Sequence, residues 1–183
     1  MYVGVFAMMP EAIEDVNEHV LARIRRAGFT GVGWRCPNPL EVSLEDLGRL
    51  RSVMEQGGVE LAQLSARNPD LVHPDDSQRR AGIHLMQRMC AVARRAKAHT
   101  LYVRPGSLNP RGSWYPHPEN RYPRTLERLV TSLKEVAKAA EQEGVPLALE
   151  GHVLSPLYSA ERVKEVLDAV GSPALRFNAD PVN

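Results

Sequence analysis

Two carboxylates near the C-terminus are the residues of this sequence best placed to do chemistry. Glu150 ends the apolar run VPLALE, and Asp180 follows the second run ALRFNA. Between the runs lies a helical pattern with Ser159 as a plausible N-cap and Gly171 at its end, so the segment predicts strand, helix and parallel strand. Side chains just past the carboxyl ends of neighbouring parallel strands lie on one rim, where ligands bind. We therefore expect Glu150 and Asp180 to face one site.

A pair of hard oxygen ligands on adjacent strand ends indicates a divalent metal ion such as Mg²⁺ or Mn²⁺. Either carboxylate alone is better explained as a polar residue that caps a helix. The two together favour the metal, because converging carboxylates repel one another unless a cation lies between them.

Length and composition limit the classes of protein. The 183 residues are enough for one good core and too few for two comfortable domains, so residues 1–183 are expected to form a single domain. A formal net charge of +1 gives no footprint for nucleic acid or an anionic membrane. The chain opens directly with a strand pattern and has no long apolar run, which predicts a cytoplasmic protein without a membrane partner. Cys36 and Cys90 are expected to be buried thiols.

Strand and helix patterns alternate along the chain, with roughly thirty residues per unit. The expected strands cover residues 2–7, 30–34, 59–64, 100–103, 145–150 and 174–180, and the expected helices cover residues 10–27, 43–56, 76–98, 123–143 and 159–170. Such repeats form either a barrel or an open doubly wound sheet. The segment after the first strand, AMMPEA, lacks the glycine-rich fingerprint of the open sheet, so the barrel is favoured.

The predicted fold is therefore α/β, the first six βα units of a (β/α)8 TIM barrel. A complete barrel needs about 250 residues, and six units would leave unpaired strands at both edges. Either the sequence is a piece of a longer protein, or a partner, such as a second copy of the chain in a homo-oligomer, closes the gap.

The longest irregular stretch, residues 105–122, carries Trp114 and His117. Loops of this length in a compact domain tend to be functional. A tryptophan with polar neighbours suits a sugar, whose C–H face can lie on the ring, so we expect both residues to contact substrate. The alternative is a self-packed loop with Trp114 as its buried plug. Arg104, at the fourth strand end, is expected to bind a substrate oxygen or phosphate, and Arg35 is a weaker candidate.

The segments LALEGH and FNADPVN, together with the βα spacing, resemble the xylose isomerase-like TIM barrels. These are sugar-phosphate isomerases and epimerases, with inosose dehydratase, ketose 3-epimerases, hydroxypyruvate isomerase and endonuclease IV among their relatives. The resemblance covers the whole chain as roughly the first three-quarters of such a barrel.

This resemblance implies that Glu150 and Asp180 bind a divalent metal ion, one of Mn, Mg, Co or Zn, and that the remaining ligands lie beyond Asn183. Many epimerases of the family carry Asp-x-x-His after the sixth strand. Here Asn183 stands where the substrate-contacting imidazole would be, so we expect Asn183 to contact substrate. His152, two residues after Glu150, is either a further substrate contact or a loop histidine that bonds to the backbone.

The resemblance also implies a reaction. The metal ion chelates adjacent carbonyl and hydroxyl oxygens of a sugar and stabilises the enediolate that forms when a carboxylate removes the proton next to the carbonyl. Glu150 is expected to be both ligand and acid/base. The expected function is an isomerase or epimerase, or an inosose-type dehydratase, with a small-molecule sugar or sugar phosphate as partner.

Two alternatives remain open at this stage. One is a non-catalytic sugar-binding or interaction module. The other is a DNA-repair nuclease like endonuclease IV, which the near-neutral charge and six scattered histidines disfavour.

Overall fold

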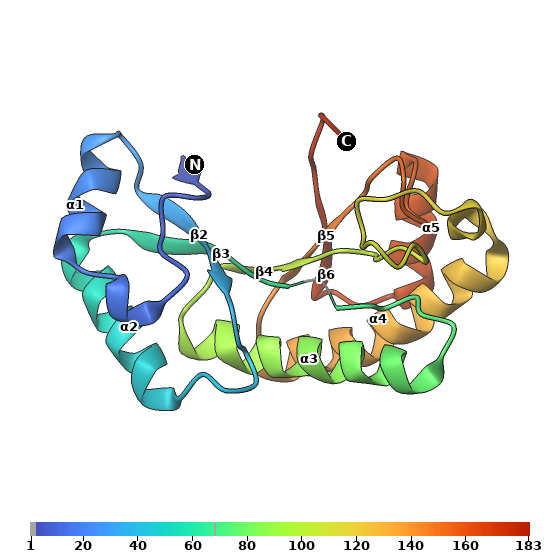
Figure 1. Ribbon diagram of the computed structural model, residues 1–183, viewed down its shortest axis with the longest axis horizontal. Helices are drawn as coiled ribbons and strands as arrows, with labels where there is room; N and C mark the ends of the chain where they lie inside the picture. The colour runs from blue at the N-terminus through green and yellow to red at the C-terminus, as the bar shows by residue number, and fades with distance from the viewer. Residues whose placement is uncertain (1–2, 68) are drawn as a thin grey trace.

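The computed structural model describes residues 3–67 and 69–183, which form a six-stranded parallel sheet with helices on its outer side (Figure 1). The strands follow one another in chain order from β1 to β6, and each pairs in parallel with the next. The elements are β1 (Gly4–Val5), η1 (Ile13–Asp15), α1 (Glu18–Arg26), β2 (Gly31–Cys36), α2 (Leu44–Gly57), β3 (Glu60–Ala66), α3 (Asp76–Arg95), β4 (Thr100–Val103), η2 (Pro118–Arg121), α4 (Pro123–Glu143), β5 (Leu147–Glu150), α5 (Ala160–Val170) and β6 (Leu175–Asn178).

The helices follow the outside of the curved sheet in the order of the chain. Each contacts the next, from α1 to α5, and Figure 1 shows them wrapping the sheet from one edge to the other. β1 and β6 lie at the two edges and do not pair. An open doubly wound sheet would carry helices on both faces, whereas here one face remains for a ligand. The predicted fold, six strands of a TIM barrel, is confirmed.

The alternation of side chains along the strands decides which residues form the core. On β4, Leu101 and Val103 are fully buried, whereas Tyr102 between them and Arg104 after them line a cavity. The same alternation on β5 buries Leu149 in the core and ends the strand with Glu150 at the cavity. The sheet therefore packs an apolar outer face against the helices and presents polar side chains at the carboxyl ends of its inner face.

Two helices start at serine caps. Ser43 Oγ accepts a hydrogen bond from the amide of Asp46 (3.0 Å), and Ser159 Oγ accepts one from the amide of Arg162 (3.3 Å), so both serines are N-caps, and the cap predicted at Ser159 is confirmed. Gly171 ends α5 with a φ of 66°, in the left-handed region that suits glycine.

The helix expected to begin at residue 10 starts later, and that prediction is wrong. Its first part is the short η1, and α1 begins only after Asn17, whose side chain accepts a hydrogen bond from the amide of Val20 (3.1 Å). The indole N–H of the buried Trp34 donates to the carbonyl of Glu11 (3.1 Å) and so holds the preceding segment against β2. Tertiary contact and a stronger cap together override the apolar periodicity. None of the helices in the described part of the chain is long and apolar enough to span a membrane.

Candidate functional site

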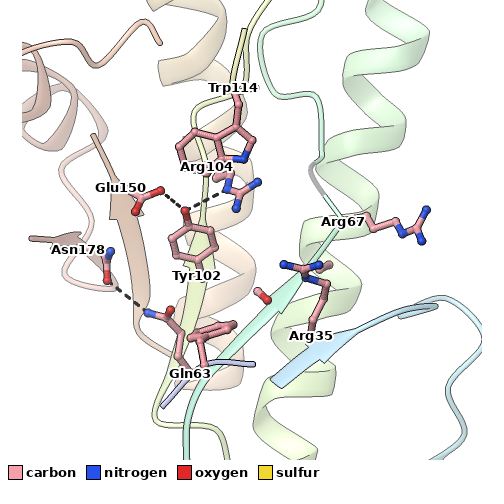
Figure 2. A pocket seen from close by; sticks show the side chains of 11 residues that line it. Arg35, Gln63, Arg67, Tyr102, Arg104, Trp114, Glu150 and Asn178 are labelled. Carbon is pink, nitrogen blue, oxygen red and sulfur yellow. Dashed lines mark hydrogen bonds between the residues drawn. The ribbon is translucent and has the colours of Figure 1, made fainter. Parts of the chain in front are cut away.

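A cavity of about 600 Å³ opens on the inner face of the sheet, at the carboxyl ends of its strands (Figure 2). This is the end of a parallel barrel at which ligands bind. The residues that line the cavity are Phe6, Arg35, Gln63, Ser65, Ala66, Arg67, Tyr102, Arg104, Trp114, Glu150 and Asn178. They come from β2 to β6, from the segments after β1 and β3, and from the loop after β4, so almost the whole sheet contributes to the cavity.

A chain of three side chains fixes the carboxylate of this cavity. Glu150, the last residue of β5, is only 6% exposed, and its Oε2 accepts a hydrogen bond from the hydroxyl of Tyr102. The Nε of Arg104 donates in turn to the hydroxyl oxygen of Tyr102 (3.0 Å), as Figure 2 shows. Burial, reinforced by the hydrogen bond to Glu150, raises the pKa of Tyr102 to about 12. Tyr102 therefore keeps its proton near neutral pH and serves as a permanent donor to Glu150.

The aromatic ring of Trp114 covers Arg104, the last of these three hydrogen-bonded side chains. The Cζ of Arg104 lies 4.4 Å from the ring centroid of Trp114, and the ring of His152 meets Trp114 edge-on at 4.6 Å. Trp114 is 43% exposed, so it is not the buried plug of a self-packed loop. His152 Nδ1 accepts a hydrogen bond from the amide of Leu154 (3.2 Å), which is the backbone-bonding role considered for it. The histidine thus orients the indole that faces the cavity.

The long loop that carries Trp114 is held by Asn120. The buried amide of this residue accepts a hydrogen bond from the amide of Leu108 (2.9 Å) and donates to Ser107 Oγ (2.9 Å) and to the carbonyl of Leu154 (2.7 Å). The loops after β4 and β5 are therefore tied together beside the cavity. His117 lies at the start of η2, where its Nδ1 accepts a hydrogen bond from the amide of Glu119 (3.2 Å), and it does not line the cavity.

The two carboxylates follow neighbouring parallel strands, but they are placed differently. β6 ends at Asn178, which is the register partner of Glu150, so Asp180 lies two residues beyond the strand. Its carboxylate accepts hydrogen bonds from the amide of Val182 (2.9 Å) and from the side chain of Asn183 (3.0 Å). Neither Asp180 nor Asn183 lines the cavity. Asn178 lines it instead.

The described residues do not complete a metal site. Among residues 3–67 and 69–183, no three His, Cys, Asp or Glu side chains gather closely enough to hold a metal ion. Glu150 and Asp180 are hard oxygen donors of the correct type, but the immediate partners of Glu150 are a hydroxyl donor and, behind it, a guanidinium. The metal site therefore stays a prediction that needs ligands besides these two.

Several side chains of the cavity were not among the sequence candidates, and most of them sit inside apolar strand patterns. Gln63 interrupts the run LAQLS and donates from Nε2 to Oδ1 of Asn178 (3.3 Å). Tyr102 stands between Leu101 and Val103, where its hydroxyl is easily taken for part of the core. The available signal was the spacing of two that places Tyr102 and Arg104 on one face of a strand.

The fold and the site define a class: a partial TIM barrel with a polar ligand cavity at the carboxyl ends of its strands. The chain belongs to the xylose isomerase-like TIM barrel family, whose model matches residues 21–183, and the predicted resemblance is confirmed. No curated protein sequence matches the chain.

Solved structures share this fold at low sequence identity. An L-ribulose 3-epimerase is 20% identical with a TM-score of 0.79, over 96% of this chain and 59% of its own. A D-psicose 3-epimerase studied with D-fructose is 18% identical with a TM-score of 0.77, over 97% of this chain and 62% of its own. A xylose isomerase-like TIM barrel protein from Mycobacterium smegmatis in complex with magnesium is 15% identical with a TM-score of 0.71, over 98% of this chain and 64% of its own. The chain thus spans about three-fifths of the length of these relatives, and the likeness concerns the fold.

Proposed function

We propose that the protein acts as a sugar isomerase or epimerase that moves a proton at a carbon next to a carbonyl group, through an enediolate, on a ketose, aldose or polyol ketone. The observation that carries the proposal is the buried carboxylate of Glu150, fixed at the end of β5 inside a cavity of about 600 Å³. Membership of the xylose isomerase-like family supports it. Two of the structural neighbours are named as epimerases of the sugars L-ribulose and D-psicose, which also supports it.

In this proposal Glu150 removes the proton as a general base. The hydroxyl of Tyr102 holds the carboxylate in one orientation, and the Nε of Arg104 fixes that hydroxyl at 3.0 Å. A base held in one rotamer meets the substrate with little loss of conformational freedom. If the proton returns to a different carbon or to the opposite face, the product is an isomer or epimer, whereas loss of a hydroxyl gives the dehydration of an inosose-type enzyme.

The other lining residues suit a polyhydroxylated substrate. The half-exposed indole of Trp114 offers a flat apolar face to sugar C–H groups, and the neutral side chains of Gln63, Ser65 and Asn178 offer donors and acceptors to hydroxyl groups. The proposal assigns substrate contact to Arg104 and Trp114. His152 acts by orienting Trp114.

The proposal includes a divalent cation as cofactor. Glu150 and Asp180 are the residues of this chain that would hold it, together with ligands that the described residues do not supply. When bound, such an ion would polarise the substrate carbonyl and stabilise negative charge on its oxygen. The magnesium named for the Mycobacterium smegmatis relative supports this part of the proposal.

One observation favours a second candidate, a sugar-binding module without catalysis. Glu150 is the only carboxylate among the described residues that line the cavity. An epimerase that returns the proton to the opposite face needs a second acid there, whereas a binding module does not.

Solvent exchange separates these two functions. The protein is loaded with Mn²⁺ and incubated in D₂O with L-ribulose, D-psicose or D-fructose, and deuterium at the carbon next to the carbonyl is followed by NMR. Exchange reports the enediolate whichever product forms. We expect Glu150→Gln to slow it by about 10²-fold or more, the usual range for a lost general base.

Glu165→Gln is the matched control, because this carboxylate pairs with Arg162 (2.6 Å) on α5, away from the lining residues. Exchange that survives in Glu150→Gln would refute the assigned base. Sugar binding without any exchange would favour the binding module.

A further inference from the structure

The indole of Trp114 lies in a part of the chain without regular secondary structure. Residues 104–117 form neither helix nor strand, and they carry Trp114 between the end of β4 and η2. Positions on a loop are defined less precisely than positions on a strand unless buried side chains support them. The indole nevertheless contacts Arg104, whose Cζ lies 4.4 Å from the ring centroid. Its support therefore has to come from side chains around the loop.

Asn120 supports the indole from within the same loop. Its side chain is only 2% exposed, and it accepts a hydrogen bond from the amide of Leu108 (2.9 Å) and donates to Ser107 Oγ (2.9 Å). The Ser107 hydroxyl donates in turn to the carbonyl of Tyr115 (2.8 Å), the residue that follows Trp114. The amide of Asn120 thereby fixes the backbone next to the indole.

The same amide reaches the other side of the indole through the loop after β5. Asn120 Nδ2 also donates to the carbonyl of Leu154 (2.7 Å), and the backbone N–H of Leu154 donates to His152 Nδ1 (3.2 Å). The ring of His152 then meets Trp114 edge-on at 4.6 Å. Because a buried polar network with satisfied hydrogen bonds is rigid, one side chain holds the indole from two sides.

We infer that Asn120 is a positioning residue for the proposed reaction, because its amide sets the place of the indole of Trp114. That indole covers the guanidinium of Arg104, whose Nε donates to the hydroxyl of Tyr102, and this hydroxyl donates to Glu150 (Figure 2). Asn120 does not line the cavity, so it acts only through these side chains. The inference rests on the proposed function and adds a residue that needs no contact with substrate.

Fluorine NMR tests, without any sugar, whether Asn120 fixes the indole. The protein has two tryptophans, Trp34 and Trp114, so labelling with 5-fluorotryptophan gives two ¹⁹F resonances, which the Trp114→Phe variant assigns. Asn120→Ala should shift or broaden the Trp114 resonance and leave that of the buried Trp34 unchanged. Asn120→Asp keeps the acceptor for the amide of Leu108 but turns a carboxylate oxygen towards the carbonyl of Leu154, so it should have the same effect.

A double-mutant cycle tests whether the effect reaches the cavity through Trp114. Affinity is measured by isothermal titration calorimetry with L-ribulose, D-psicose and D-fructose. We expect Asn120→Ala to weaken sugar binding by about tenfold, because a displaced indole loses its contact with the substrate. In a Trp114→Ala background the same substitution should change the affinity by less than about twofold, since the indole that Asn120 positions is gone.

Ser132→Ala is the matched control. Ser132 is fully buried on α4 and donates from Oγ to the carbonyl of Leu71 (2.8 Å), so this variant loses a buried hydrogen bond of the same kind outside the two loops. It should leave the Trp114 resonance and the sugar affinity unchanged, even where the free energy of unfolding falls. A merely structural role of Asn120 would give the same result as this control.

Ser107→Ala is a milder variant, for the case that the Asn120 variants do not fold. It removes the hydroxyl that joins Asn120 to the carbonyl of Tyr115 and keeps the hydrogen bond between Asn120 and Leu154. The Trp114 resonance should shift in this variant as well.

A Trp114 resonance that stays unchanged in the folded variants would overturn the inference. An affinity loss of equal size with and without the indole would also overturn it, because Asn120 would then act independently of Trp114. Failure of the proposed function gives a different result: the parent protein catalyses no deuterium exchange, whereas the Trp114 resonance still shifts in the variants. Exchange together with an unchanged resonance would remove this inference and leave the proposed function standing.

Discussion

Removing the hydroxyl of Tyr102 tests the hydrogen-bonded chain on which the site depends. Tyr102→Phe keeps the ring and deletes the donor to Glu150, a carboxylate that is only 6% exposed and accepts no other side-chain hydrogen bond from the described residues. Hydrogen bonds to charged groups contribute about 1.5–3 kcal/mol, and a buried acceptor left without its donor costs a similar amount. We therefore expect the free energy of unfolding at neutral pH to fall by about 1.5–3 kcal/mol.

Urea unfolding followed by circular dichroism measures this change, and an unchanged m value would show that the unfolded state is unaffected. In a Glu150→Gln background the acceptor is neutral, so the same substitution should cost only about 1 kcal/mol. Tyr115→Phe is the control, because the Tyr115 hydroxyl makes no hydrogen bond within the described part of the chain, and it should stay within about 0.5 kcal/mol of the parent protein. A loss of less than about 0.5 kcal/mol for Tyr102→Phe would refute the reasoning. An equal loss in the parent protein and in the Glu150→Gln background would also refute it.

Two further predictions concern packing and thiol chemistry. A Cβ on Gly82 of α3 would lie 2.8 Å from the carbonyl oxygen of Asp70, so Gly82→Ala should destabilise by about 1–3 kcal/mol. Gly48 lies at an exposed position of α2, with no described atom within 4 Å of the new Cβ, so Gly48→Ala should stabilise the protein by up to about 1 kcal/mol. Equal effects of Gly82→Ala and Gly48→Ala in thermal unfolding would contradict this prediction. Burial raises the pKa of the Cys36 thiol to about 11 and that of Cys90 to about 12, from 9.0. Both thiols therefore ionise at a lower pH in the unfolded chain than in the folded protein. Their contribution to the free energy of unfolding should be fully present below about pH 9 and should be lost as the pH rises towards 11. A variant with both Cys36→Ala and Cys90→Ala should lose less stability over this pH range than the parent protein. Rapid labelling of either thiol in the native protein at about pH 8 would contradict the burial of the thiols.

The local sequence determined the elements and the family. The helix of residues 123–143 has the predicted bounds because Pro123 begins it and Gly144 ends it in the left-handed region, with a φ of 66°. Such signals act within a few residues and do not depend on the rest of the fold. The same holds for Ser43 and Ser159 as caps, and for Glu150 as the last residue of a buried strand. The motifs LALEGH and FNADPVN predicted the family correctly because they combine strand-end carboxylates with a βα rhythm that the whole chain keeps.

The tertiary structure alone decided which side chains meet. Tyr102 and Glu150 are 48 residues apart, and Gln63 and Asn178 are 115 apart, yet each pair forms a hydrogen bond across the sheet. The register of β5 against β6 places Asn178, not Asp180, opposite Glu150, and a shift of register by a single residue would turn every β6 side chain to the other face. Register depends on which face of each strand is buried against the rest of the fold, so it involves residues far apart in the sequence. For that reason the sequence identified Glu150 and Arg104 as separate candidates, whereas only the folded chain showed that the hydroxyl of Tyr102 joins them.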